Sequence, residues 1–286
     1  MPGAKVLVSP RVGFRWYTDD SHKTLIRGGV GIFTGRVPFV WLSNAYNNTG
    51  MESMGTTIEP KQGNNHTNTA PSLAQYAKDP MGAATSVETG ALRPDIVTVD
   101  KDFKYPQVLR ANLALEQRLP GDVKLTLEGI YSKTMNNVFF ENLALNNDGE
   151  KVYAIPGVEA SAAPFYSKTR SNYYSIVNLR NTNKGYTYAF SASLAKSFDF
   201  GLDMSASYTF GRSKSVNDGT SSVAYSNWKY NYSRDTNSEN ELGFSKFDVP
   251  HRLMAQLSYT TPKYLNGWTS TTISVIYNVS PVAVTA

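Results

Sequence analysis

Residues 108–131, VLRANLALEQRLPGDVKLTLEGIY, alternate apolar and polar side chains on both sides of a Pro-Gly-Asp turn. The period of two is that of a β-strand with one apolar face, and the central tripeptide is a strong turn signal. Its apolar positions are Leu109, Ala111, Leu113 and Leu115, then Val123, Leu125, Leu127, Gly129 and Tyr131. The stretch therefore predicts an antiparallel hairpin with one apolar and one polar face.

Three further pairs of segments have the same pattern. They are 6–17 with 24–33, 186–194 with 202–210, and 253–260 with 272–277. Turn residues join them at 19–23, 198–201 and 262–267. We predict an all-β, antiparallel fold of about eight strands in four hairpins.

The connections between the hairpins are long and polar, whereas those within hairpins have about six residues at most. The long ones are 34–105, 135–185 and 213–247. Turn lengths in a soluble sandwich have no reason to alternate, but in an outer-membrane barrel all short turns face the periplasm and all long loops face outside. Residues 1–286 are therefore predicted to form part of one transmembrane β-barrel domain in a bacterial outer membrane.

The composition is consistent with a chain that crosses the membrane with β-strands and not with helices. The longest apolar run, Val37 to Leu42, has six residues and includes a proline, while a helix needs about 20 to cross a bilayer. Aromatic residues make up 12% of the chain, and several flank the predicted short turns. They indicate an interfacial girdle, although aromatic residues also favour strands and hairpin ends in general. Outer-membrane lipid is thus an expected partner.

Enzyme chemistry is not expected. The chain has no cysteine, and His22, His66 and His251 have no spacing typical of a metal site or a catalytic triad. The net charge of +5 is scattered, which does not indicate nucleic-acid binding. We predict neither a catalytic residue nor a metal or other cofactor.

The polar strand faces and the first long loop hold the candidate binding residues. We expect the polar faces to line the barrel interior, as a mixed-charge network, with Arg110, Asn112, Glu116, Lys124 and Glu128. In the loop, aromatic and amide side chains could bind a sugar or peptide, the alternative being an ordinary solvated loop. The loop candidates are Trp41, Asn44, Tyr46 and Asn47, and a short helix is predicted at 71–78.

Three segments resemble TonB-dependent outer-membrane receptors and transporters, especially the Oar-like receptors of Bacteroides-type bacteria. The segments are SPRVGF at 9–14, RGGVGIFTGRVPFVW at 27–41 and FDVPHR at 247–252. The resemblance extends over nearly the whole chain. It implies a periplasmic N-terminal region, a plug domain and a barrel of about 22 strands, of which this chain is a fragment without plug or signal peptide. It also implies import of a solute driven by TonB, and a surface lipoprotein covers the barrel in related systems.

Within those segments, structural roles are predicted for five residues. Gly28, Gly29 and Gly31 allow a bend of the wall or the close approach of another backbone such as a plug. Asp248 and Arg252 flank the start of a strand, and an ion pair between them is expected to fix it.

Two other interpretations of the sequence remain open. A structural or adhesive barrel would bind a partner through its loops without transport, and a plug sequence with a TonB box upstream would favour import instead. A soluble β-sandwich would place its apolar faces against each other. The substrate cannot be read from the sequence.

Overall fold

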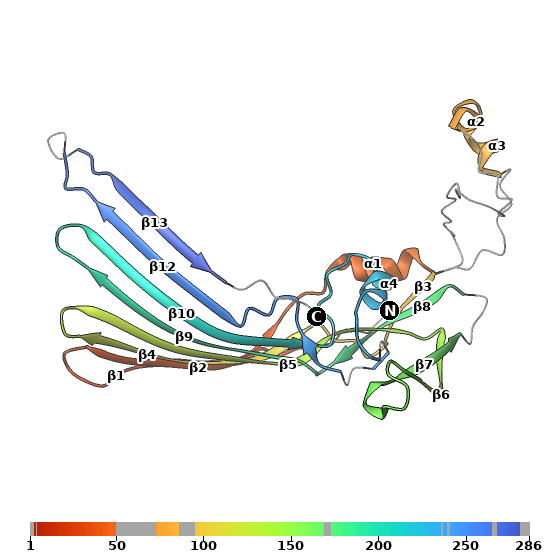
Figure 1. Ribbon diagram of the computed structural model, residues 1–286, viewed down its shortest axis with the longest axis horizontal. Coiled ribbons are helices and arrows are strands. Elements are labelled where there is room, and N and C mark those ends of the chain that lie inside the picture. The colour runs from red at the N-terminus through yellow and green to blue at the C-terminus, as the bar shows by residue number, and fades with distance from the viewer. Residues whose placement is uncertain are drawn as a thin grey trace.

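The central hairpin forms as predicted. β4 (Gln107–Leu119) and β5 (Val123–Asn142) pair antiparallel, with Leu115 opposite Leu127. The computed structural model describes residues 3, 5–49, 73–85, 95–168, 173–235, 237–238, 241–264 and 268–280. Within this part, the sheet runs in the order β1 (Arg11–Tyr17), β2 (Thr24–Thr34), β4, β5, β9 (Tyr186–Ser197), β10 (Leu202–Ser215), β12 (His251–Thr260) and β13 (Thr272–Val279) (Figure 1). The eight predicted strands and their pairing into four antiparallel hairpins are confirmed.

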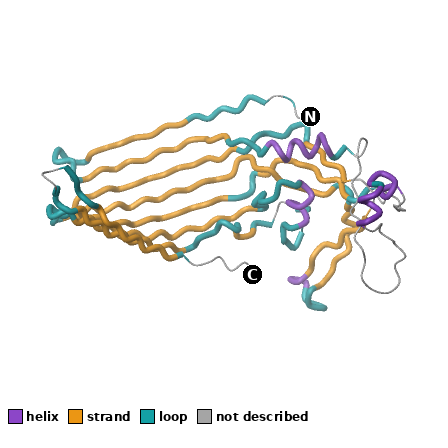
Figure 2. Tube along the Cα trace, turned by 90° about the horizontal axis from the view of Figure 1, so that it is seen from above, coloured by secondary structure: helices purple, strands orange, loops and turns teal. Residues whose placement is uncertain are grey.

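The connections sort by length to opposite ends of the sheet (Figure 2). The turns at 18–23, 120–122 and 198–201 lie at one end together with the described parts of the fourth connection, 261–264 and 268–271. The described parts of the long connections lie at the other end. The fourth connection is longer than predicted, because β12 ends at Thr260 and β13 begins only at Thr272. Within it, a bridge pairs Tyr264 with Thr269. The alternation on which the barrel prediction rested is therefore present in three dimensions.

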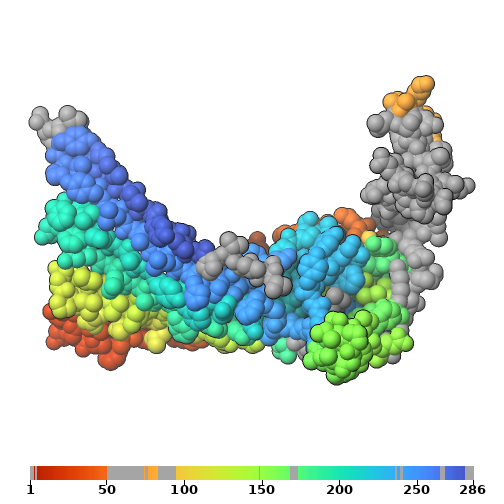
Figure 3. All heavy atoms as spheres, in the orientation of Figure 1, coloured from red at the N-terminus to blue at the C-terminus, as the bar shows by residue number. Residues whose placement is uncertain are grey.

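One face of the sheet is apolar and exposed, and the other is polar. The sheet curls into an open trough (Figure 3). Val12 and Phe14 point away from its concave side, and the strand register places the other apolar positions on the same face as these two residues. Leu113 and Phe190 are 58% and 59% exposed, which is far from a soluble core. Other exposed members of this face are Val12, Phe14, Trp16, Val30, Leu109, Leu127, Tyr131, Leu194, Met204, Tyr208, Leu253, Leu257, Ile273, Val275 and Tyr277. Such a continuous apolar surface needs hydrocarbon against it.

The sandwich alternative does not hold. Among the described residues no second sheet covers the apolar face, and β1 and β13 form the edges of a single open wall. Trp16 and Phe200, both 60% exposed, lie at or beside the short turns, where an interfacial girdle belongs. No described helix has the length and apolar character needed to span a membrane.

The long connections form their own folded unit, which the sequence did not predict. β5 continues beyond β4 to Asn142 and pairs there with β8 (Ser175–Thr182), which pairs in parallel with β3 (Asp95–Val99). The helices α1 (Phe39–Asn47) and α4 (Ala224–Lys229) cover this small sheet. Its buried core consists of Val37, Trp41, Val97, Phe103, Val138, Phe140, Val177, Leu179 and Ala224. We call this unit the loop core.

The prediction that residues 135–185 form a polar connection is therefore wrong for its first residues, which continue strand β5 to Asn142. Val138, Phe139 and Phe140 are all less than 5% exposed, because both faces of β5 are covered there. A strand covered on both faces loses its period-two pattern, so it cannot be recognised by alternation.

The remaining described elements are short and lie in the long connections. They are α2 (Leu73–Lys78), α3 (Pro80–Thr85), the β6–β7 hairpin (Leu145–Tyr153 and Ala162–Lys168), the 3-10 helix η1 (Glu159–Ser161) and β11 (Gly243–Phe244). α2 confirms the predicted helix at 73–78, and residues 71–72 of that prediction lie outside the described residues.

Glycine is required in the turn between β9 and β10. Gly201 has φ +92°, and a Cβ there would lie 2.2 Å from the carbonyl oxygen of Thr260. Gly201→Ala is expected to destabilise the folded protein by about 1–3 kcal/mol, because it adds a clash to an unfavourable backbone conformation. Gly149→Ala is the matched control, since Gly149 has φ +82° with nothing near its Cβ position. Thermal melts of the two variants should differ, and equal melting temperatures would contradict the clash.

Candidate functional site

The polar face contains a compact network of charges from three strands. Glu116 of β4 accepts hydrogen bonds from Arg27 Nε at 2.8 Å and from Lys124 Nζ at 2.6 Å. Glu128 of β5 lies 3.5 Å from the same guanidinium. The structure therefore brings three of the predicted interior residues, Glu116, Lys124 and Glu128, into one ion-pair network centred on Arg27.

The other two predicted interior residues lie toward the long-loop end, beside β1 and β2. The strand register places Arg11, Gly31 and Arg110 in one row across the sheet, and Gly13, Gly29 and Asn112 in the next. Arg15 and Arg27 follow in a third row. Four arginines thus surround a floor of three glycines, which we call the arginine patch.

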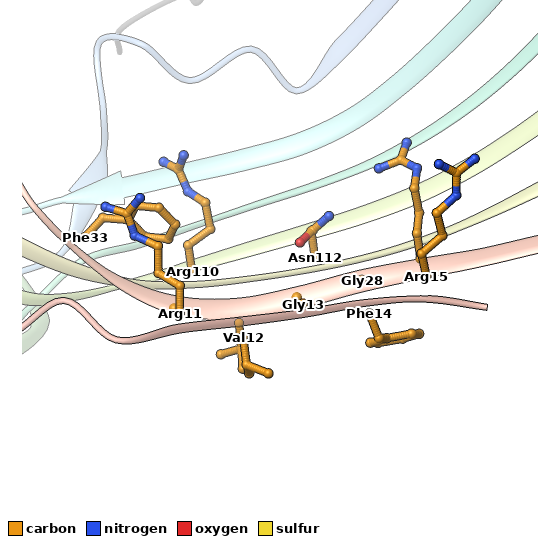
Figure 4. Close-up of a pocket in the computed structure, with 13 residues that line it drawn as sticks. Arg11, Val12, Gly13, Phe14, Arg15, Gly28, Phe33, Arg110 and Asn112 are labelled. Atoms are coloured by element: carbon orange, nitrogen blue, oxygen red, sulfur yellow. The ribbon is translucent and has the colours of Figure 1, made fainter.

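Figure 4 shows how the side chains of the arginine patch are oriented. Arg11, Arg15 and Arg110 rise on the concave side of the sheet, and Val12 and Phe14 point to the opposite side. The pocket they border has a volume of about 640 Å³, which lies within the usual range for small-molecule sites.

The glycines of the second strand do not mark an interruption of the sheet. Pairing runs without a register shift through Gly28, Gly29 and Gly31 on both sides of β2. A Cβ at Gly28 would lie 2.8 Å from the carbonyl oxygen of Asn112 and 3.0 Å from the ring of Phe14. The backbones that approach these glycines closely are therefore those of the neighbouring strands. On the concave side, the glycines have no side chains that would cover the backbone.

Two of the loop candidates, Trp41 and Asn44, are held by contacts within the protein, whereas accessible side chains were predicted. Trp41 is 8% exposed, its ring contacts Phe140 edge-on at 5.2 Å, and its Nε1 donates to the carbonyl oxygen of Ser221. Asn44 joins α1 to the α4 region, since its Oδ1 accepts from the backbone N–H of Ala224. The prediction that Trp41 offers an exposed ring for stacking is therefore wrong, because Trp41 is a buried residue of the loop core.

The other two loop candidates differ from each other. Tyr46 is 64% exposed, so its ring is accessible on the loop core. Asn47 donates from Nδ2 to the hydroxyl of Ser43 one turn earlier in α1. Ligand contact by this helix remains a prediction, resting now mainly on Tyr46.

Asp248 and Arg252 do not form the predicted ion pair. Asp248 is buried and binds the Arg212 guanidinium at 3.0 Å and the backbone N–H of Ser213, both in β10. Arg252 instead donates to Asn278 of β13. Sequence proximity suggested the wrong partner, because the segment before β12 folds back against the end of β10.

This pairing predicts different effects for two substitutions. Asp248→Asn should destabilise the barrel by about 2 kcal/mol, because it weakens charge-assisted hydrogen bonds at a buried carboxylate. Arg252→Gln should have a much smaller effect, since Arg252 is exposed and is not the partner of Asp248. Urea unfolding of both variants in detergent micelles tests the assignment, and a larger loss for Arg252→Gln would refute it.

Sequence reasoning missed Arg11, Arg15 and Arg27 as functional candidates. The sequence nevertheless indicates which face they are on, because residues an even number of positions apart lie on the same face of a strand. Arg27 is therefore on the face of Gly29 and Gly31, and Arg11 and Arg15 are on the face of Gly13. No group of three His, Asp or Glu side chains that could hold a metal ion occurs in the described ranges.

The comparison with protein families agrees with this geometry. Residues 2–286 match the model of an outer membrane beta barrel domain. The curated proteins contain no significant match to the chain. Taken with the exposed apolar wall and the sorted turns, the match shows that the chain belongs to the outer membrane β-barrel domain family and resides in a bacterial outer membrane.

Proposed function

We propose that the protein is an outer-membrane receptor that imports a solute through a plugged barrel, with energy supplied by TonB. The supporting observation is the polar concave face, which carries an organised charge network and an open arginine patch. A barrel that served only as an anchor has no need for a cluster of arginines on its concave face. The resemblance of three sequence segments to TonB-dependent receptors is the reason for proposing TonB as the energy source.

The loop core gives this receptor a preformed outer surface. Because long loops of outer-membrane barrels face outside, the unit built from α1, α4, β3 and β8 lies at the extracellular end. Its buried aromatic contacts and amide hydrogen bonds hold a fixed shape. A rigid outer surface suits capture of a solute, and a surface lipoprotein would dock at this end.

The test is physical coupling to TonB. Full-length protein, purified from outer membranes in detergent, should bind the purified C-terminal domain of TonB, and deletion of its N-terminal TonB box should abolish the binding. A full-length protein that lacks plug and TonB box, and does not bind this domain, would contradict import.

A second function, adhesion without transport, is favoured by one feature. The β6–β7 hairpin projects from the loop end, with Val152, Ile155 and Phe165 each more than 40% exposed. Exposed apolar groups on a projecting hairpin are typical of protein contact sites. Deleting residues 146–166 should abolish partner binding on whole cells if adhesion is the function, and should leave TonB binding unchanged under import.

A further inference from the structure

The arginine patch differs from the rest of the polar face in its charge balance. Arg27 is neutralised by Glu116 and Glu128. No carboxylate of the described residues lies within ion-pair distance of Arg11, Arg15 or Arg110. Three guanidinium groups therefore face the barrel interior without a negative partner in the part of the chain that the structure describes.

These three arginines are held in position by neutral groups. Arg11 lies over the ring of Phe33 at 4.5 Å, and Arg110 approaches the same ring at 5.8 Å. Arg110 also donates from Nε to the hydroxyl of Ser132, and Arg15 donates to the hydroxyl of Tyr17. Each guanidinium keeps donors unused, since Arg carries five N–H groups in a planar fork.

The spacing of the patch suits a ligand with several anionic groups. Arg11 and Arg15 are four residues apart on β1, roughly 14 Å between Cα atoms, and β4 lies roughly 10 Å from β1. The glycine floor between them lets a ligand lie against the backbone, and Asn112 adds an amide at its edge. Arginine binds carboxylate and phosphate groups through paired hydrogen bonds, which favours these two chemistries over other anions.

We propose that the arginine patch is a binding site for a small solute carrying two or more carboxylate or phosphate groups. This inference rests on the proposed function, because it names the class of solute that the importer carries. An anion between Arg11 and Arg110 removes the repulsion of two cations placed around one aromatic ring. Arg27, the fourth arginine of the patch, is already paired with Glu116 and Glu128, whereas Arg11, Arg15 and Arg110 are left available to a ligand.

Calorimetric titration of the full-length protein in detergent tests the site. Citrate and tripolyphosphate are the probes, and acetate and glucose are the matched controls for charge number and for size. Wild-type protein is expected to bind at least one of the two polyanions, with affinity that falls as salt rises, and to bind neither control. The stronger polyanion tells which of the two chemistries the site prefers.

The variants locate the binding. Arg11→Gln with Arg110→Gln should weaken polyanion binding by about tenfold or more, because each substitution removes charge-assisted hydrogen bonds. Arg118→Gln is the control, since Arg118 is an exposed arginine on the same face of β4 near the short turn. Absence of polyanion binding in the wild type, an unchanged affinity in the double variant, or an equal loss in Arg118→Gln would overturn the proposal.

The outcome is independent of the coupling experiment. Polyanion binding by a protein that does not bind TonB would leave the site standing and refute import. TonB binding without polyanion binding would leave import standing and refute the site.

Discussion

Leu127→Arg is expected to destabilise the barrel in lipid vesicles by about 1–4 kcal/mol, the cost of placing a cation against hydrocarbon. Leu127 lies on the convex face of β5, opposite Leu115 and Ala192 of the neighbouring strands, and is 41% exposed. Because no described helix or second sheet packs over this position, most of the cost comes from lipid. Urea unfolding of protein refolded into phosphatidylcholine vesicles gives the free energy of unfolding.

The adjacent residue provides the control. Thr126 lies on the concave face opposite Glu116, so an arginine there meets water and a carboxylate. Thr126→Arg should change stability by well under 1 kcal/mol, as is usual for surface substitutions. If both variants lose the same stability, the two faces of the strand do not contact different environments. The assignment of lipid to the convex face and water to the concave face would then be wrong.

The second large effect is expected in the loop core. Phe140→Ala should destabilise this unit by about 3–5 kcal/mol, because it leaves a cavity where a ring 1% exposed meets Trp41. Since the unit lies outside the membrane, the loss should appear as local opening and leave the membrane-spanning strands folded. Limited trypsin digestion should therefore release loop peptides while the barrel keeps its heat-modifiable migration on a gel.

An exposed phenylalanine serves as the comparison. Phe165 in the β6–β7 hairpin is 44% exposed, and Phe165→Ala removes the same atoms without creating a buried cavity. Its digestion pattern should match that of the wild type. Equal resistance of the Phe140→Ala protein to trypsin would show that the loop core is not held together by this packing.

The membrane wall could be predicted from the sequence because its information is local. Each strand keeps one apolar and one polar side, so residues two apart, such as Leu113 and Leu115, report the same environment. The pairing of each strand with the next also follows from short turns such as Pro120 to Asp122. Parity of the connections then separated a barrel from a sandwich.

The loop core could not be predicted, since it depends on contacts between distant residues. Trp41 meets Phe140 from a different long connection, and Asn44 meets Ala224. No local pattern specifies such partners. Trp41 was accordingly taken for a surface residue, and Asp248 was paired with Arg252, four residues away in sequence, instead of with Arg212 in β10.

The candidate site lies between these two cases. Arg110 and Asn112 could be assigned to the polar face from alternation, and the structure places Arg110 in the arginine patch and Asn112 at its edge. Arg11 and Arg15 join them only through the pairing of β1 with β2. Alternation gives the face of a residue, but only the register gives its neighbours.

One measurement tests the central claim most directly, and the absence of cysteine makes it practical. Single cysteines at positions 190 to 194 of β9 carry a nitroxide spin label in protein reconstituted into vesicles, and collision with oxygen and with a water-soluble nickel complex is recorded. We predict that oxygen collision dominates at Phe190, Ala192 and Leu194, and that nickel collision dominates at Ser191 and Ser193. A profile without alternation, or with the two sets exchanged, would contradict a wall with lipid on its convex side and water on its concave side.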